Sequence, residues 1–568
     1  MSGTHSPQAQ SSLEVRGKVG LLLIFLVLSL WISLTRVYQV DEAQNAYMAW
    51  LMGARPPGNF YMSAPLFLAP LAWLSRFSGS AETVFLQARL LFWVLFWVNL
   101  VLLVKGAGLR LRSRAGGWTL LAIALLPPLW TYGLEVRHEN AILCGLLSLW
   151  VVGRRCIAKP WAFLALGLLS CFMQLCAFKA IAYWAPLTFI LLLLPPPQSL
   201  LSGRRRILHW IAGFGIGCFV GAGIHLAMGT LHAYLLDQIA LFHATTRVVR
   251  FAPWSAASKF LTQAPLLVAL LVIPAAAFMA QSIRASWRRS SWDGPLPEIL
   301  LWSWTCLLLV VNPNPFPYNL LTVTACGSLA VIAMQRHALP GGLLANGNRT
   351  LLVSLLLFAQ GVPFATQIFR LLSATNDRQV QLMSWTERLT DPASDTVFDG
   401  AGLVPTRRSP MSMWFVNLTN LDGFRGSLGG TLDQVILRDA PPVLIPTYRF
   451  NYLTREDLEA VQQNYLGLAP DLLVLGRDLH QGAQVWECRH PGRYALVLGA
   501  STPSEGTFEV DGHSISPGIY SFRAGSHNLL VPSAGRARVE WVGPTLQAPF
   551  RPQGEDALPG VFPIPNSF

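Results

Sequence analysis

The sequence predicts a polytopic α-helical membrane protein with a C-terminal extracytoplasmic α/β plus β-sandwich domain. Hydrophobic residues make up 52% of the 568 residues, and the mean hydropathy is +0.43, which exceeds the usual range for soluble proteins. Apolar windows of roughly 20 residues, long enough to cross a bilayer, recur over the first two thirds of the chain. The final third is more polar. We expect a cytoplasmic tail over 1–18, a transmembrane domain over 19–372, an α/β region over 373–483 and a β-rich region over 484–568.

About eleven transmembrane helices are expected from the apolar windows. The expected spans are 19–35, 83–104, 117–133, 140–152, 161–178, 180–196, 208–229, 264–283, 298–312, 319–334 and 350–370. The first is preceded by Arg16 and Lys18 and is followed by no convincing cleavage site, which predicts an uncleaved signal anchor. The segment "APLFLAPLAWL" is short and rich in proline, so we expect interfacial or re-entrant helices there.

The positions of the basic residues predict the orientation. The net charge is +13, and four acid-free clusters lie between apolar runs: "KGAGLRLRSR", "GRRCIAK", "GRRR" and "SIRASWRR". This is the positive-inside pattern, and it assigns all four clusters to the cytoplasm. An odd number of spans then puts the C-terminal domain outside. Nucleic-acid binding is disfavoured because the basic residues do not gather on one soluble face.

The C-terminal third predicts strands and one well-defined helix. The helix is expected over 454–468, "TREDLEAVQQNYLGL", because Thr454 is a good N-cap and acids follow it. "PPVLIPTY" and "PDLLVLG" indicate strands on either side of it. From Gln484 onward, short alternating strands resemble a PEGA-like module ("VDG…PGIYSFRAGSHNLLV").

Cysteine usage supports neither a disulfide framework nor a zinc site. Seven of the eight cysteines lie in or beside apolar runs, Cys488 is alone in the C-terminal region, and no CxxC occurs.

Ionisable residues expected on the outer side are few and are concentrated near the bilayer, where charges usually face a cavity, form pairs or have a function. They are Asp41, Glu42, Arg89, Glu135, Arg137, His138, Glu139, Lys179, Asp237, Arg247 and Arg250. Structural interpretations compete with functional ones. Arg89 and Lys179 could reach to the interface, Glu135 and Arg137 could pair locally, and Asp237 could be solvated. Asp41 and Glu42 stand out because they directly follow the first apolar run.

A family resemblance comes from the first outer loop. The run "VDEAQNAYMAWLMGARPPGNFYMSAPL" followed by "RLLFWVLFW" resembles the membrane GT-C glycosyltransferases, and in particular the protein O-mannosyltransferase and aminoarabinose-transferase-like group. "CAFKAIAYWAP" and "NPFPYNLL" are similar to later segments of that group. The resemblance covers roughly residues 20–335. The sequence departs from the group at "SAPL", where the family often has His or Lys before the prolines.

The resemblance implies roles for individual residues. Asp41 matches the catalytic carboxylate, and Glu42 is its neighbour. Lys179 matches a residue near the lipid phosphate, Arg137 and His138 lie in a loop that contributes to the donor site, and Arg89 or Arg247 would also face the phosphate. Tyr61 and Tyr318 match pocket positions. Because of the departure at "SAPL", no residue is assigned as a metal ligand, and dependence on a divalent metal ion is left open.

These expectations define a reaction. A sugar on a polyprenyl-phosphate donor leaves a phosphate, so the enzyme needs a base for the acceptor and cations for the leaving group. We expect an inverting glycosyltransferase that transfers the sugar to a hydroxyl or phosphate of a lipid, glycan or protein acceptor, at the outer side of a bacterial inner membrane. Two alternatives are a transporter or flippase of a lipid-linked substrate and a non-catalytic envelope scaffold. A transporter usually shows two related halves, which this sequence lacks.

Overall fold

The computed structural model describes residues 7–54, 65–111, 113–156, 158–193, 201–232, 234–235, 258, 261–263, 265, 268, 296–311, 317–337, 346–411, 431–498, 507–531 and 537–552. The chain divides into two compact units. The helical unit comprises Met1–Arg36, Pro65–Ala69 and Ala88–Thr375. The sheet unit comprises Val37–Ala64, Pro70–Gln87 and Asn376–Phe568.

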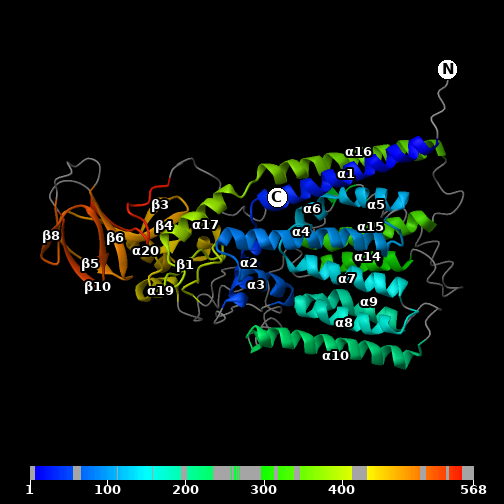
Figure 1. Ribbon diagram of the computed structural model, residues 1–568, viewed down its shortest axis with the longest axis horizontal. Helices are drawn as coiled ribbons and strands as arrows, with labels where there is room; N and C mark the ends of the chain where they lie inside the picture. Colours follow the sequence, from blue (N-terminus) through cyan, green and yellow to red (C-terminus); the bar gives the residue numbers. More distant parts are fainter. Residues whose placement is uncertain are drawn as a thin grey trace, which may run out of the picture. The chain divides into compact units, whose positions relative to one another are not determined.

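Long helices lie side by side in the helical unit, with α1 alongside α16 and α8 alongside α10 (Figure 1). Large aromatic side chains such as Trp130 and Trp150 fill the space between them. The elements are α1 (Pro7–Thr35), η1 (Leu66–Leu68), α4 (Ala81–Gly106, which begins in the sheet unit), α5 (Arg114–Ala124), α6 (Pro127–Gly133), α7 (His138–Arg155), α8 (Trp161–Cys176), η2 (Phe178–Ala180), α9 (Ile181–Leu193), α10 (Gly203–Ala227), α14 (Leu296–Val311), η3 (Pro317–Asn319), α15 (Leu320–His337) and α16 (Asn346–Ser373).

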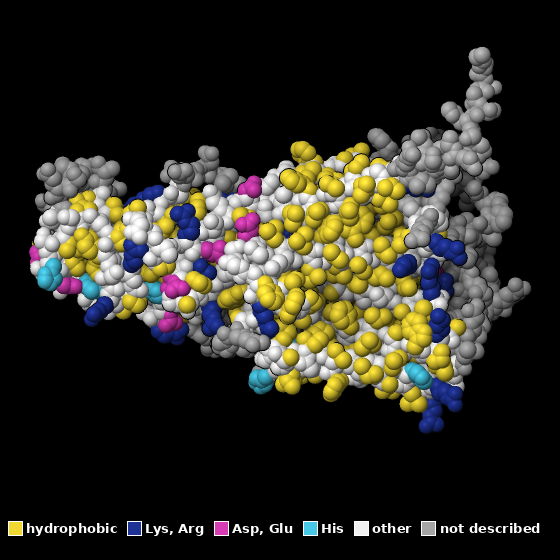
Figure 2. Space-filling view, in the orientation of Figure 1, with side chains coloured by type: hydrophobic (Ala, Val, Ile, Leu, Met, Phe, Trp, Pro, Cys, Tyr) yellow, Lys and Arg dark blue, Asp and Glu magenta, His cyan; other side chains and the backbone are white. Residues whose placement is uncertain are grey.

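Three helical segments in the described part of the chain are long and apolar enough to cross a membrane: Gly17–Thr35, Ala81–Gly106 and Gly203–Ala227. Their outer faces carry exposed apolar side chains, among them Val27 and Phe219, which is 82% exposed. Figure 2 shows apolar side chains spread over the visible face of the helical unit and Lys and Arg gathered at one end of it. The expected span 264–283 lies almost entirely outside the described residues. Each of the other expected spans overlaps a helix, and the full count of about eleven stays a prediction.

The expected span over 117–133 is divided into two helices, α5 and α6. Pro127 has no N–H to continue the helix, and it disfavours a helical conformation at the residue before it. The break leaves backbone carbonyls without helical partners. The indole N–H of Trp130 donates to the carbonyl of Ala124 over 2.5 Å, and the Gln360 side chain donates to that of Leu125 over 3.3 Å. Side chains thus satisfy the freed backbone groups, as a low-dielectric environment demands.

Helices α8 and α10 pack at very short range through glycines. Gly213, Gly217 and Gly221 recur at every fourth residue and therefore share one face of α10. A Cβ at Gly213 would overlap the backbone carbonyl of Leu164 on α8, and one at Gly217 would lie 2.7 Å from the Cβ of Cys171. Small residues at this spacing let membrane helices approach closely and gain van der Waals contact.

The sheet unit is mixed α/β. Its elements are α2 (Val40–Gly53), α3 (Ala69–Ser75), α17 (Asp377–Leu389), β1 (Val397–Phe398), α19 (Leu432–Arg438), β2 (Val443–Leu444), η4 (Tyr448–Tyr452), α20 (Arg455–Asn464), β3 (Tyr465–Ala469), β4 (Leu472–Leu479), β5 (Gly482–Cys488), β6 (Gly492–Leu498), β7 (Phe508–Val510), β8 (His513–Ile515), β9 (Gly518–Phe522), β10 (Gly525–Val531) and β11 (Ala537–Trp541). A seven-stranded sheet has the order β1-β2-β4-β11-β6-β9, with β3 also paired to β4. A four-stranded sheet has the order β5-β10-β7-β8. The larger sheet takes strands from both sides of the expected boundary at 483/484.

Helix α2 and the residues just before it belong to the core of the sheet unit. The side-chain oxygen of Gln379 on α17 accepts from the Tyr38 amide over 2.6 Å, and its side-chain N–H donates to the Tyr38 carbonyl over 3.0 Å. Ala43 and Ala46 of α2 are fully buried in the same hydrophobic cluster as α17 and the strands. Residues more than 300 positions apart in sequence therefore fold together.

The expected helix over 454–468 ends at Asn464, and β3 begins at Tyr465. The start is as expected, because the Thr454 hydroxyl accepts from the Asp457 amide. Pairing of β3 with β4 and burial of Tyr465, whose hydroxyl donates to the Pro441 carbonyl, overrides the local helical preference. Gly467 weakens that preference further.

Substituting Gly213 by alanine is expected to destabilise the protein by about 1–3 kcal/mol, because the new methyl group meets backbone that cannot move aside. Gly215→Ala is the matched control: its Cβ would meet nothing within 4 Å, and alanine is the better helix former. Thermal unfolding of the detergent-purified protein measures both. Equal melting temperatures for the two variants would contradict the close packing of α8 on α10.

Candidate functional site

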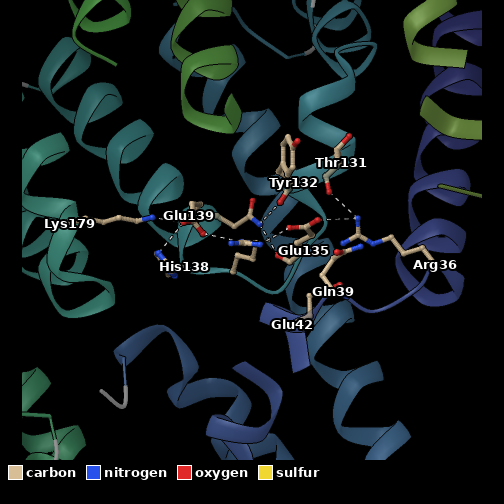
Figure 3. A network of polar contacts seen from close by, with 11 residues as sticks. Arg36, Gln39, Glu42, Thr131, Tyr132, Glu135, His138, Glu139 and Lys179 are labelled. Atoms are coloured by element: carbon tan, nitrogen blue, oxygen red, sulfur yellow. Dashed lines mark hydrogen bonds and ion pairs between the residues drawn. The ribbon is translucent and has the colours of Figure 1, made fainter. Parts of the chain in front are cut away.

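A chain of buried charges connects α6, α7 and η2 in the helical unit (Figure 3). Glu135 and Arg137 lie in the turn between α6 and α7, and Glu139 lies in the first turn of α7. Arg137 contacts the Glu135 carboxylate through Nη1 and the Glu139 carboxylate through Nε, each over 3.4 Å. Lys179 Nζ lies 2.5 Å from Glu139 Oε1. We call these four residues the charge chain.

Further contacts hold the Glu135 end of the charge chain. Arg36, at the end of α1, lies with Nη1 4.0 Å from Glu135 Oε1, and it donates to the Thr131 carbonyl over 3.0 Å. The Asn140 side chain donates to the carbonyls of Tyr132 and Glu135. The turn that carries the charges is therefore fixed by hydrogen bonds to its own backbone.

Tyr318 in η3 brings the two cations of the charge chain together. The Arg137 guanidinium carbon lies 3.7 Å from the centre of the Tyr318 ring, and Lys179 Nζ lies 5.0 Å from it. Both distances are in the range of cation–π attraction. Three residues predicted for the donor site and its pocket, Arg137, Lys179 and Tyr318, thus lie together in one unit.

Burial differs along the charge chain. The side chains of Glu135, Arg137 and Glu139 are less than a tenth exposed, whereas that of Lys179 is 34% exposed. A buried charge needs a partner close by, and each of these residues has one. Lys179 is the member of the charge chain that a ligand can reach most directly. Its position is fixed by the carboxylate of Glu139 behind it.

The other predicted donor-site residues have different surroundings. His138 Nε2 lies 3.0 Å from Glu139 Oε1, so His138 joins the charge chain from the side. Arg89 is fully buried and donates through Nη1 to the Arg36 carbonyl over 2.6 Å, a contact that ties α4 to the end of α1. Arg247 and the predicted pocket residue Tyr61 lie outside the described residues.

The two acids of the opening pair lie in the first turn of α2, in the sheet unit, and differ in burial. Glu42 is fully buried, and its carboxylate accepts from the Gln39 amide over 3.0 Å, which caps the helix. Asp41 is half-buried and benefits from the positive end of the helix dipole. The pair therefore divides into a capping residue and a more accessible carboxylate.

Residues of η4 make up part of the surroundings of Asp41. Burial raises the pKa of the Tyr448 hydroxyl to about 12; the positive charge of Arg449 opposes this rise, and the negative charge of Asp41 adds to it. The Arg449 guanidinium carbon lies 4.8 Å from the centre of the Tyr448 ring. A carboxylate, a phenol and a guanidinium are thus close enough to interact electrostatically within one unit.

Sequence reasoning missed part of this arrangement. It included Glu135 and Glu139 among the outer charges but assigned them no role in a site, although the spacing in "EVRHE" already sets acids on both sides of Arg137. Tyr448 and Arg449 carry no sequence signal of proximity to Asp41, because more than 400 residues separate them along the chain.

Within the described ranges, no group of three or more His, Cys, Asp or Glu side chains is arranged to hold a metal ion. No protein-family model and no curated protein sequence matches the chain.

Glu139→Gln is expected to lower stability by about 1–3 kcal/mol, because it removes the carboxylate that faces Arg137 and Lys179. The loss should stay below the roughly 3–5 kcal/mol typical of a fully buried pair, because water screens the exposed part of Lys179. Thermal unfolding tests this, with exposed Glu509→Gln as the control. A melting temperature unchanged from the parent protein would show that the charge chain does not stabilise the helical unit.

Proposed function

We propose that the protein is an inverting glycosyltransferase that uses a polyprenyl-phosphate-linked sugar as donor. The observation that carries the proposal is the position of Lys179 and Arg137 on the ring of Tyr318, with Lys179 at the accessible end of a buried charge chain. A helical unit with membrane-spanning helices gives a lipid-linked donor an apolar surface to lie against.

The proposed chemistry needs cations more than it needs a protonating acid. Phosphate is a good leaving group, and its developing negative charge is stabilised by fixed cations in a poorly hydrated site. Lys179 would contact the phosphate, and the more buried Arg137 would add the electrostatic field of its positive charge. Glu139 and Glu135 keep both cations oriented before the donor binds, so little reorganisation is needed during the reaction.

Asp41 is the proposed general base, which would take the proton from the acceptor hydroxyl as that oxygen attacks the anomeric carbon. This assignment is supported by the sequence resemblance in the first loop and by the partial exposure of Asp41. Glu42 is instead proposed to act through the fold, because its carboxylate caps α2. A single displacement of this kind inverts the configuration of the sugar.

The proposal includes a membrane orientation. About eleven spans with cytoplasmic basic clusters would put the sheet unit outside a bacterial inner membrane, where polyprenyl-phosphate sugars present their headgroups. The acceptor would be a hydroxyl or phosphate of a lipid, glycan or protein in that compartment. The GT-C fold is part of the same proposal.

Asp41→Asn should abolish transfer while leaving the fold and donor binding intact. Loss of a general base lowers kcat by roughly 10²- to 10⁴-fold. The assay is release of polyprenyl phosphate from purified protein supplied with a set of lipid-linked sugars and a membrane extract as acceptor. Asp478→Asn, at an exposed position on β4, is the control. Near-normal turnover in Asp41→Asn would exclude Asp41 as the base.

Lys179→Met should weaken binding of the lipid-linked donor by roughly 10- to 100-fold, since it removes a charged contact to phosphate. Lys159→Met, at an exposed lysine, is the matched control, and binding is measured by quenching of tryptophan fluorescence. Unchanged affinity in Lys179→Met would contradict the phosphate assignment. Movement of the donor across vesicle membranes without product would instead favour a flippase, and neither activity with any donor would favour a scaffold.

A further inference from the structure

A cavity of about 330 Å³ opens in the sheet unit, and nothing in the proposed reaction uses it. It lies between α19 and α20 on one side and strands β4, β5 and β6 on the other. Its volume falls at the lower end of the range of small-molecule sites, about 300–1,000 Å³.

One wall of the cavity is a face of α20. Glu456, Glu459 and Gln463 follow one another at spacings of three and four residues, so they share that face of the helix. Only Glu459 of these is held by an ion pair in the described residues, with the exposed Arg455 over 2.7 Å. Gln463 and Asn464 add side-chain amides at the end of the helix.

The facing wall combines acids and guanidinium groups from the strands. Arg477 on β4, Glu487 on β5 and Arg489 just after β5 line it. Arg489 is held in place by hydrogen bonds to the Asn464 side chain and the Leu437 carbonyl, each over 3.2 Å. This contact connects the two walls and fixes the width of the cavity at one end.

Two aromatic side chains form an apolar part of the lining. Trp486 and Tyr494 pack edge to face with ring centres 5.0 Å apart, and both are almost fully buried. They are held by the core and would not move when a ligand binds. The cavity is thus a preformed one with a rigid apolar base and polar walls.

The hydrogen-bonding groups that line the cavity determine which class of ligand it can bind. Carboxylates only accept hydrogen bonds, guanidinium groups only donate them, and amides do both. A hydroxyl group also does both, so a ligand with many hydroxyls can satisfy adjacent acceptors and donors in the same wall. Four lining carboxylates, those of Asp433, Glu456, Glu459 and Glu487, outnumber the two guanidinium groups, which disfavours phosphates and other anions.

We propose that this cavity is a binding site for a short, non-anionic saccharide. The site would hold sugar rings against the Trp486 and Tyr494 side of the cavity, with hydroxyls bonded to Gln463 on one wall and to Arg477 on the other. The proposal does not depend on the transferase reaction. A saccharide would bind here even in a protein whose Asp41 has been replaced.

Saturation-transfer NMR on the full chain in detergent tests the proposal directly. The probes are maltotriose, cellotriose and triacetylchitotriose, with inorganic phosphate as the anionic comparison in a competition arm. We expect transfer to at least one trisaccharide and no displacement of it by phosphate. Transfer to none of the three, or displacement of the trisaccharide by an equal concentration of phosphate, would overturn the proposal.

Variants of the lining residues test whether the saccharide binds in this cavity. The double substitution Gln463→Ala and Arg477→Met should weaken saccharide binding roughly tenfold or more, because it removes one polar partner on each wall. Gln462→Ala, at the adjacent exposed position of α20 that does not line the cavity, should bind within about twofold of the parent. Thermal unfolding confirms that the variants are folded. Equal affinity for the double variant and the parent would place the saccharide elsewhere and overturn the site.

Discussion

A carboxylate removed from water must be neutralised by cations at short range, and the arrangement around Glu139 follows from this constraint. Glu139 is 3% exposed and is approached by Arg137, His138 and Lys179. Each of these side chains comes from a different local context: the turn before α7, the start of α7 and η2. To bring them together, the turn after α6, the start of α7 and η2 must meet at one point, and the ring of Tyr318 in η3 lies against Arg137 and Lys179 there. The charge chain thus fixes the relative positions of several helices as well as forming a candidate phosphate site.

Much of the secondary structure could be predicted because hydrophobic windows and turn residues are local signals. Helix α4 and strands β2, β4, β9 and β10 lie at expected segments. Two expectations failed for different reasons. Pro127 divides an apolar window that hydropathy alone predicts as one helix, which is a local effect of proline. Pairing with β4 converts the end of an expected helix into β3, which is a tertiary effect. The glycine face of α10 has a four-residue spacing that is visible in the sequence, but only the partner backbone at Leu164 shows why Gly213 differs from Gly215.

The candidate site was less predictable, because its contacts are long-range. The family resemblance predicted Lys179, Arg137 and Tyr318 individually, from different segments of the chain. No spacing rule could indicate that one aromatic ring would face both cations. The roles of Glu139 and Glu135 depend on burial, which a sequence does not specify. The difference between Asp41 and Glu42 depends on the capping geometry of α2, where neighbouring positions on the helix leave one carboxylate half-buried and the other fully buried.

The paired hydrogen bonds between Tyr38 and Gln379 limit how far the protein could be truncated from its C-terminus. Ala43 and Ala46 of α2 are covered by side chains from the C-terminal region, so a protein that stopped before Asn376 would leave an apolar helix face in water. Such a face promotes aggregation or proteolysis of the first loop. The C-terminal region is therefore no detachable appendage: a fragment containing only the helical segments would lose the structure around Asp41 along with it.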